Sequence, residues 1–151
     1  MKLLICDDMK ELFEYYKKVF LRTKEIKVVG MAHNGDECIE MVAKTEPDIL
    51  LLDIQMRTND EGLEIIKDLL EIKPDLKIIM LTAHRVEDYV FRAFSAGAVD
   101  FLYKTADDEE IIAKVMDVYN NKASIEADIA APLTKKLRDA MKMQKSLLYT
   151  V

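Results

Sequence analysis

The sequence lacks any apolar run near the roughly 20 residues that a membrane-spanning helix needs. Acidic residues also follow residues 1–6 too soon for a signal peptide, so a cytoplasmic protein without a membrane partner is expected. Cysteine is scarce: Cys6 lies in an apolar run and Cys38 in a helical pattern, without paired spacing. That arrangement predicts two buried, reduced thiols and argues against a cysteine metal or redox site.

An excess of positive charge is missing as well. The formal net charge is −6, and residues 1–122 hold 17 Lys and Arg against 25 Asp and Glu. An acidic body argues against a nucleic-acid groove in the main domain. Residues 123–151 hold 5 basic against 3 acidic residues, too weak a charge to indicate one there. With 151 residues, 50% of them hydrophobic, the chain can form one domain plus an appendage, and it is not disordered as a whole.

Short apolar segments alternate with helical spacing along the first 120 residues. Alternating strands and helices joined by right-handed crossovers form a parallel sheet with helices on both faces. Five such units predict a flavodoxin-like α/β fold with strand order 2-1-3-4-5. The predicted strands cover residues 2–6, 27–32, 49–53, 77–81 and 99–103. The predicted helices cover 9–21, 63–72, 86–96 and 111–120, and a further helix that carries residues 38–43 follows a turn and cap at Asn34-Gly35-Asp36.

Polar side chains follow four of these strands at the point where each strand ends. Asp7 and Asp8 follow the first strand, Asp53 ends the third, Thr82 follows the fourth, and Lys104 follows the fifth. In the predicted order these ends meet at one rim, in the crevice where open α/β sheets bind ligands. Three carboxylates together require a cation, and all-oxygen ligation with few protein groups suits Mg²⁺. Such a site can transfer a phosphoryl group onto Asp53, because that reaction needs mainly positioning and charge neutralisation.

The same residues resemble a known family. The receiver domain of two-component response regulators has a similar set of motifs at similar spacing, carried here by Asp7-Asp8, Asp53-Ile54-Gln55-Met56, Thr82-Ala83 and Phe101-Leu102-Tyr103-Lys104. The residues from Lys104 to Glu110 are similar to the branch whose receivers precede a LuxR-type helix-turn-helix.

This resemblance implies a role for each motif residue. Asp53 would accept phosphate from a sensor histidine kinase, and Lys104 would pair with the phosphoryl group. Thr82 would move toward that group, and Phe101 would turn inward as it moves, although Phe101 could equally be a plain core residue. The resemblance also implies a Mg²⁺ site made by Asp53, Asp7, Asp8 and the backbone carbonyl of Gln55. By resemblance alone, Tyr16 and the exposed side of the first helix are expected to contact the kinase.

Two regions depart from the simple pattern. The loop over residues 56–62 is one residue longer than is usual in receivers and lacks their proline, so the sequence does not define its conformation. Beyond residue 121, apolar residues at three- and four-residue steps predict an amphipathic helix over about 125–148. We therefore expect a receiver domain over 1–121 and a linker with a C-terminal helix over 122–151. That helix packs on its own domain, serves as a linker, or forms a homodimer.

Several functions remain open at this point. The first is a transcriptional switch whose DNA-binding output lies beyond this chain, since no second, turn-linked helix is visible. The alternative is a stand-alone receiver that acts through a protein partner. A Mg²⁺-dependent phosphatase is more remote, because such enzymes resemble Asp-x-Asp whereas Gln55 offers no general acid. An inert flavodoxin-like binding module is a further class. His84 could tune access to the rim or be a solvated loop residue, and His33, expected away from the acids, receives no role.

Overall fold

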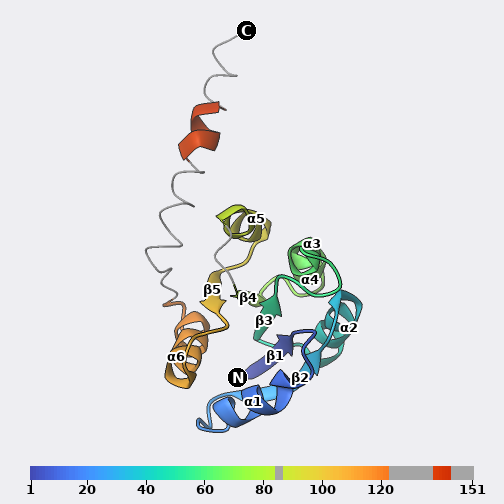
Figure 1. Ribbon diagram of the computed structural model, residues 1–151, viewed down its shortest axis with the longest axis vertical. Helices are drawn as coiled ribbons and strands as arrows, with labels where there is room; N and C mark the ends of the chain where they lie inside the picture. Colours follow the sequence, from blue (N-terminus) through green and yellow to red (C-terminus); the bar gives the residue numbers. More distant parts are fainter. Residues whose placement is uncertain (84–86, 123–137, 144–151) are drawn as a thin grey trace.

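The computed structural model describes residues 1–83, 87–122 and 138–143. Strands and helices alternate along the chain, as predicted (Figure 1). The strands are β1 (Lys2–Cys6), β2 (Lys27–Ala32), β3 (Ile49–Asp53), β4 (Lys77–Thr82) and β5 (Asp100–Tyr103). The helices are α1 (Leu12–Phe20), α2 (Gly35–Thr45), α3 (Glu61–Glu64), α4 (Ile66–Ile72), α5 (Glu87–Ala96) and α6 (Asp108–Tyr119).

The five strands form one parallel sheet in the order β2-β1-β3-β4-β5, which confirms the predicted flavodoxin-like topology. Strand β3 lies in the centre and pairs with β1 on one side and β4 on the other. Its register places Leu52 opposite Cys6 and Asp53 opposite Leu81. The chain therefore leaves β1, β3 and β4 at the same edge of the sheet.

Two apolar layers cover the sheet, one on each face. Successive side chains of a strand point to opposite faces, so neighbours in β3 enter different layers. Leu50 and Leu52 pack with residues of α2, α4 and α5, whereas Ile49 and Leu51 pack with residues of α1 and α6. Figure 1 shows α1 and α6 on one side of the sheet and the other helices on the opposite side. Because both faces are covered, the central residues of β1, β3 and β4 are apolar and buried, and polar residues stand at the strand ends.

Three helices begin or divide at positions that differ from the prediction. Helix α1 starts at Leu12 instead of residue 9, because residues 9–11 form a turn in which Asp7 Oδ1 accepts a hydrogen bond from Met9 N (3.0 Å). Helix α6 starts at Asp108 instead of 111, because the Asp107 side chain caps it by accepting from Glu110 N (2.9 Å). The predicted helix over 63–72 is two helices, α3 and α4, which meet at Ile65.

The C-terminal segment supports the predicted helix over a short stretch. Residues 138–143 are helical, with all six side chains exposed. The rest of the predicted helix over 125–148 lies outside the described residues. In the part of the chain that the structure describes, no helix has both the length and the apolar character needed to cross a bilayer.

Candidate functional site

The sheet brings the predicted site residues together at the carboxyl ends of its strands. Asp7 follows β1, Asp53 ends β3, Thr82 ends β4, and Lys104 follows β5. The backbone holds two of these ends directly, because Lys104 N donates a hydrogen bond to Thr82 O (2.8 Å). Asp7 N is fixed in the same way by Ala32 O (3.0 Å), at the end of β2. The convergence predicted from strand order is thus present.

Three carboxylates form a compact cluster at this rim. One oxygen each from Asp7, Asp8 and Asp53 lies within 4.8 Å of the others. Asp7 is completely buried and Asp53 nearly so, whereas Asp8 is exposed. Asp53 Oδ1 accepts a hydrogen bond from Gln55 N (3.3 Å), while Asp7 Oδ2 accepts none from any described residue. A buried carboxylate oxygen without a donor is costly unless a cation satisfies it.

Lys104 supplies one positive charge to this cluster. Its Nζ lies 3.0 Å from both Asp7 Oδ2 and Asp53 Oδ2; the second contact is a hydrogen bond, and the first is an ion pair by distance only. Burial works to lower the pKa of Lys104, but the charges of Asp53 and Asp7 outweigh it and raise that pKa. Lys104 is therefore a fixed cation at neutral pH.

The charge balance of the rim remains negative. One ammonium faces three carboxylates. Burial raises the pKa of Asp53 from 3.8 to about 6; the positive charge of Lys104 works against this rise, and the negative charge of Asp7 adds to it. A divalent cation with oxygen ligands would remove this repulsion and satisfy Asp7 Oδ2. The donor set therefore fits Mg²⁺ or a similar hard cation, with waters completing its coordination.

A cavity of about 90 Å³ opens beside Asp53 and extends over the ends of β3, β4 and β5. Gln55 and Thr82 line it together with Lys104, so the side chains predicted to handle a phosphoryl group share one space. Sequence reasoning missed Tyr89 of α5, which also lines this cavity. The position of Tyr89 in the sequence did not indicate a place in the site, because a tyrosine in an amphipathic helix is usually a packing residue.

The remaining candidates have different positions. Phe101 is buried, with its ring 5.4 Å from that of Phe94 between centroids. His33 was expected to lie away from the acids, and this is wrong: its Nδ1 lies 3.3 Å from the backbone oxygen of Asp7, because β2 is the neighbour of β1. His84 lies outside the described residues.

Both cysteines, Cys6 and Cys38, are buried free thiols, as predicted. A hydrogen bond with Cys38, together with burial, raises the pKa of the Cys6 thiol far above its usual range. Such a thiol stays protonated at neutral pH, and only the thiolate is a strong nucleophile. These thiols therefore contribute packing, and the prediction of reduced core cysteines is confirmed.

Relatives of known name cover most of the chain. It is 30% identical over 147 residues to the response regulator protein VraR of Staphylococcus saprophyticus, covering 97% of this chain and 68% of that protein. It is 31% identical to the transcriptional regulatory protein DegU of Brevibacillus brevis (91% of this chain, 58% of that protein) and 29% identical to the oxygen regulatory protein NreC of Staphylococcus carnosus (90% and 63%). The chain thus spans 58 to 63% of the length of these last two relatives.

Solved structures agree with the observed topology. A LuxR-family response regulator from Aurantimonas sp. SI85-9A1 superposes with a TM-score of 0.79 at 22% identity, over 89% of this chain and 96% of that one. The receiver domain of the putative response regulator NarL from Mycobacterium tuberculosis gives 0.72 at 25% identity, over 79% and 95%. The sequence profile of the response regulator receiver domain matches residues 3–116. The chain therefore belongs to the receiver-domain family of two-component response regulators, as its motifs predicted.

Proposed function

We propose that this chain is a phosphorylation switch in which Asp53 accepts a phosphoryl group from the phosphohistidine of a sensor kinase. The observation that carries the proposal is the placement of Asp53 and Lys104 in one cavity, with the buried oxygen of Asp7 left without a hydrogen-bond donor. Phosphoryl transfer needs a nucleophile, charge neutralisation and alignment more than proton chemistry. The described rim offers residues for each of these requirements.

The reacting group is the Asp53 carboxylate. Burial raises the pKa of Asp53 to about 6, which still leaves the carboxylate mainly ionised at pH 7, so it can attack as an anion. One of its oxygens forms a bond to phosphorus while the bond from phosphorus to the histidine nitrogen breaks, and the electron pair stays on the imidazole. Lys104 Nζ lies 3.0 Å from Asp53 Oδ2, so Lys104 is positioned to neutralise the charge of the transferred group.

Mg²⁺ bound by Asp7, Asp8, Asp53 and the backbone carbonyl of Gln55 would neutralise the phosphoryl oxygens. Thr82 would donate a hydrogen bond from its hydroxyl to the phosphorylated side chain. Phe101, already buried against Phe94, would repack as Thr82 moves. The Gln55 amide is too weak an acid to protonate a leaving group and too weak a base to activate a water, so the acyl phosphate would persist. That persistence supports signalling over rapid turnover of a phosphomonoester.

The output of the switch would lie outside this chain. Residues 1–121 would form the receiver and 122–151 the linker with its helix, and DNA would be contacted only by a further domain. Support comes from the relative DegU, which is named a transcriptional regulatory protein and of which this chain spans 58%. Phosphorylation could then favour a homodimer through the receiver or the linker helix.

The test is Mg²⁺-dependent labelling of Asp53. Wild type, Asp53→Asn and the control Asp75→Asn are incubated with acetyl phosphate and Mg²⁺. Asp75 is an exposed acid that precedes β4, at the edge of the sheet opposite the rim. Intact-mass measurement should show one added phosphoryl group on wild type and on the control, and none on Asp53→Asn or after EDTA treatment. Undiminished labelling of Asp53→Asn would exclude the proposal.

A further inference from the structure

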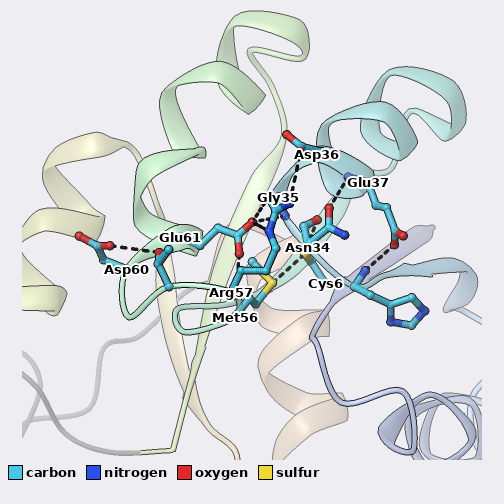
Figure 2. A network of polar contacts seen from close by, with 11 residues as sticks. Cys6, Asn34, Gly35, Asp36, Glu37, Met56, Arg57, Asp60 and Glu61 are labelled. Atoms are coloured by element: carbon cyan, nitrogen blue, oxygen red, sulfur yellow. Dashed lines mark hydrogen bonds and ion pairs between the residues drawn. The ribbon is translucent and has the colours of Figure 1, made fainter.

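The loop after Asp53 is closed by a buried glutamate, Glu61. This carboxylate is only 5% exposed, and it accepts four hydrogen bonds. Three come from Arg57: its backbone N (2.8 Å), Nε (2.9 Å) and Nη2 (2.5 Å). The fourth comes from Gly35 N (2.7 Å), at the start of α2. Figure 2 shows the Glu61 carboxylate pointing toward both Arg57 of the loop and Gly35 of the helix.

These contacts give Glu61 two simultaneous partners. Arg57 Nε and Nη2 both donate to Glu61 Oε2, and charge-assisted hydrogen bonds of this kind are among the stronger ones in proteins. The N–H of Gly35 lies at the positive end of α2, where a negative charge is favourable. Hydrogen bonds from Arg57 lower the pKa of Glu61, and the hydrogen bond from Gly35 N adds to this effect. Together they outweigh burial, which raises that pKa, and hold it below its usual value. The carboxylate therefore stays ionised at neutral pH and keeps both partners.

The same loop begins at the reactive carboxylate. Gly62 N donates to Ile54 O (2.9 Å), and a side chain at Gly62 would collide with the backbone oxygen of Asp53. Glu61 is the residue just before Gly62. At the other end of the loop, Gln55 N donates a hydrogen bond to Asp53 Oδ1. The segment from Asp53 to Gly62 is thus a closed loop that is fixed at its far end to α2.

We propose that Glu61 is a positioning residue: by binding Arg57 and Gly35 together, it fixes the loop that holds Asp53 and Gln55 in place for the metal ion and the phosphoryl group. This inference rests on the proposed function of Asp53. It deepens that function by assigning a role to Arg57 and Glu61 in the loop that the sequence left undefined. Neither residue contacts the site directly, so their effect passes through the backbone of residues 53–62.

The experiment measures Mg²⁺ affinity by calorimetry and labelling by acetyl phosphate for wild type and Glu61→Gln. This substitution keeps the size of the side chain but removes the charge that holds Arg57. Loss of a group that orients metal ligands lowers metal affinity by about tenfold or more. We therefore expect a Mg²⁺ dissociation constant about tenfold higher, while the labelling rate at saturating Mg²⁺ changes by less than about threefold, because the bound metal restores the loop.

Two further variants separate positioning from folding. Arg57→Ala removes a half-exposed side chain and leaves the Glu61 bond to Gly35 intact, so it carries the test if Glu61→Gln does not fold. It should also raise the dissociation constant, and the double variant should be no worse than Glu61→Gln, because the two residues act as one unit. The matched control is Asp36→Asn, an exposed acid that also pairs with Arg57 (3.2 Å); its Mg²⁺ affinity should match wild type.

The two proposals fail in different ways. Equal Mg²⁺ dissociation constants for wild type, Glu61→Gln and Arg57→Ala overturn the positioning role, and the proposed function stands as long as wild type is labelled on Asp53. A lower melting temperature without a change in Mg²⁺ affinity has the same meaning, since it assigns Glu61 to folding alone. If wild type itself takes no phosphoryl group, the proposed function fails regardless of the variants.

Discussion

The body and the end of strand β3 are both buried, but their side chains have opposite surroundings. Each residue from Ile49 to Leu52 is 0% exposed and touches apolar neighbours on one face of the sheet. Asp53, the next residue, is 4% exposed and lies beside Asp7 and Lys104. Burial therefore stabilises the fold along the strand, whereas at its end it leaves charges incompletely compensated. One strand thus contains part of the stable framework and, at its end, the carboxylate that we propose as the phosphoryl acceptor.

The largest effect is expected in the body of the strand. Leu51→Ala should lower the free energy of unfolding by about 3 to 4 kcal/mol, because it removes a fully buried side chain and leaves a cavity. Urea denaturation measures this loss. Leu50→Ala tests the opposite face of the sheet and should cost a similar amount. Labelling of the folded fraction should be unchanged in both, and a loss below about 1 kcal/mol would show that the core relaxes around the missing side chain.

The framework could be predicted from sequence because its signals are local and repeated. Apolar runs ended by polar residues indicated the five strands, and right-handed crossovers indicated a parallel sheet. The flavodoxin-like arrangement of five such units then indicated the strand order. Helix starts were less accurate, because they depend on single contacts. The Asp7 side chain bonds Met9 N and delays α1, and the Asp107 cap advances α6 to Asp108. Such contacts are visible only once the side chains are placed.

The next largest effect should come from Lys104 at the rim. Lys104→Met leaves buried Asp7 and Asp53 without the cation that lies 3.0 Å from each. Removing one partner of a buried ion pair is strongly destabilising, but here Asp53 can take up a proton and the rim opens to a cavity. We expect a loss of about 2 kcal/mol at pH 7 without Mg²⁺, and a smaller loss at pH 5, measured by urea denaturation.

A second lysine provides the control for this measurement. Lys73 is as little exposed as Lys104, at 16% against 19% of the side chain, but its partner Asp75 is 83% exposed. Lys73→Met should cost less than about 1 kcal/mol, with little dependence on Mg²⁺. Equal costs for the two lysines would mean that the charges at the rim are as well solvated as those at the surface.

The site could be predicted only in part. Asp7, Asp53, Thr82 and Lys104 follow strands, so their convergence follows from topology alone. Glu61 was missed, although its partner Arg57 stands four residues earlier in the sequence. Their pairing depends on the fold of an irregular loop and on Gly35 of another element, which no periodicity records.

The smallest effect should appear when Asp53 loses its charge. Its pKa is raised from 3.8 to about 6 in the folded protein, so between these values the native state binds a proton more tightly than the unfolded state. Stability from this group is therefore full below about pH 4 and is lost as the pH rises through 6. Asp53→Asn should lack this loss. Without divalent cations it should exceed wild type in free energy of unfolding by about 1 to 2 kcal/mol at pH 7, and the difference should vanish near pH 4.

Magnesium should reverse the order of these two proteins at pH 7, since it stabilises whichever native state binds it more tightly. Denaturation curves of wild type and Asp53→Asn, with and without Mg²⁺, measure both the difference and its reversal. A wild type more stable than Asp53→Asn at pH 7 without metal would mean that Lys104 fully compensates the charge at the end of β3. The body and the end of β3 would then differ only in the polarity of their side chains, because the buried charge of Asp53 would be fully compensated.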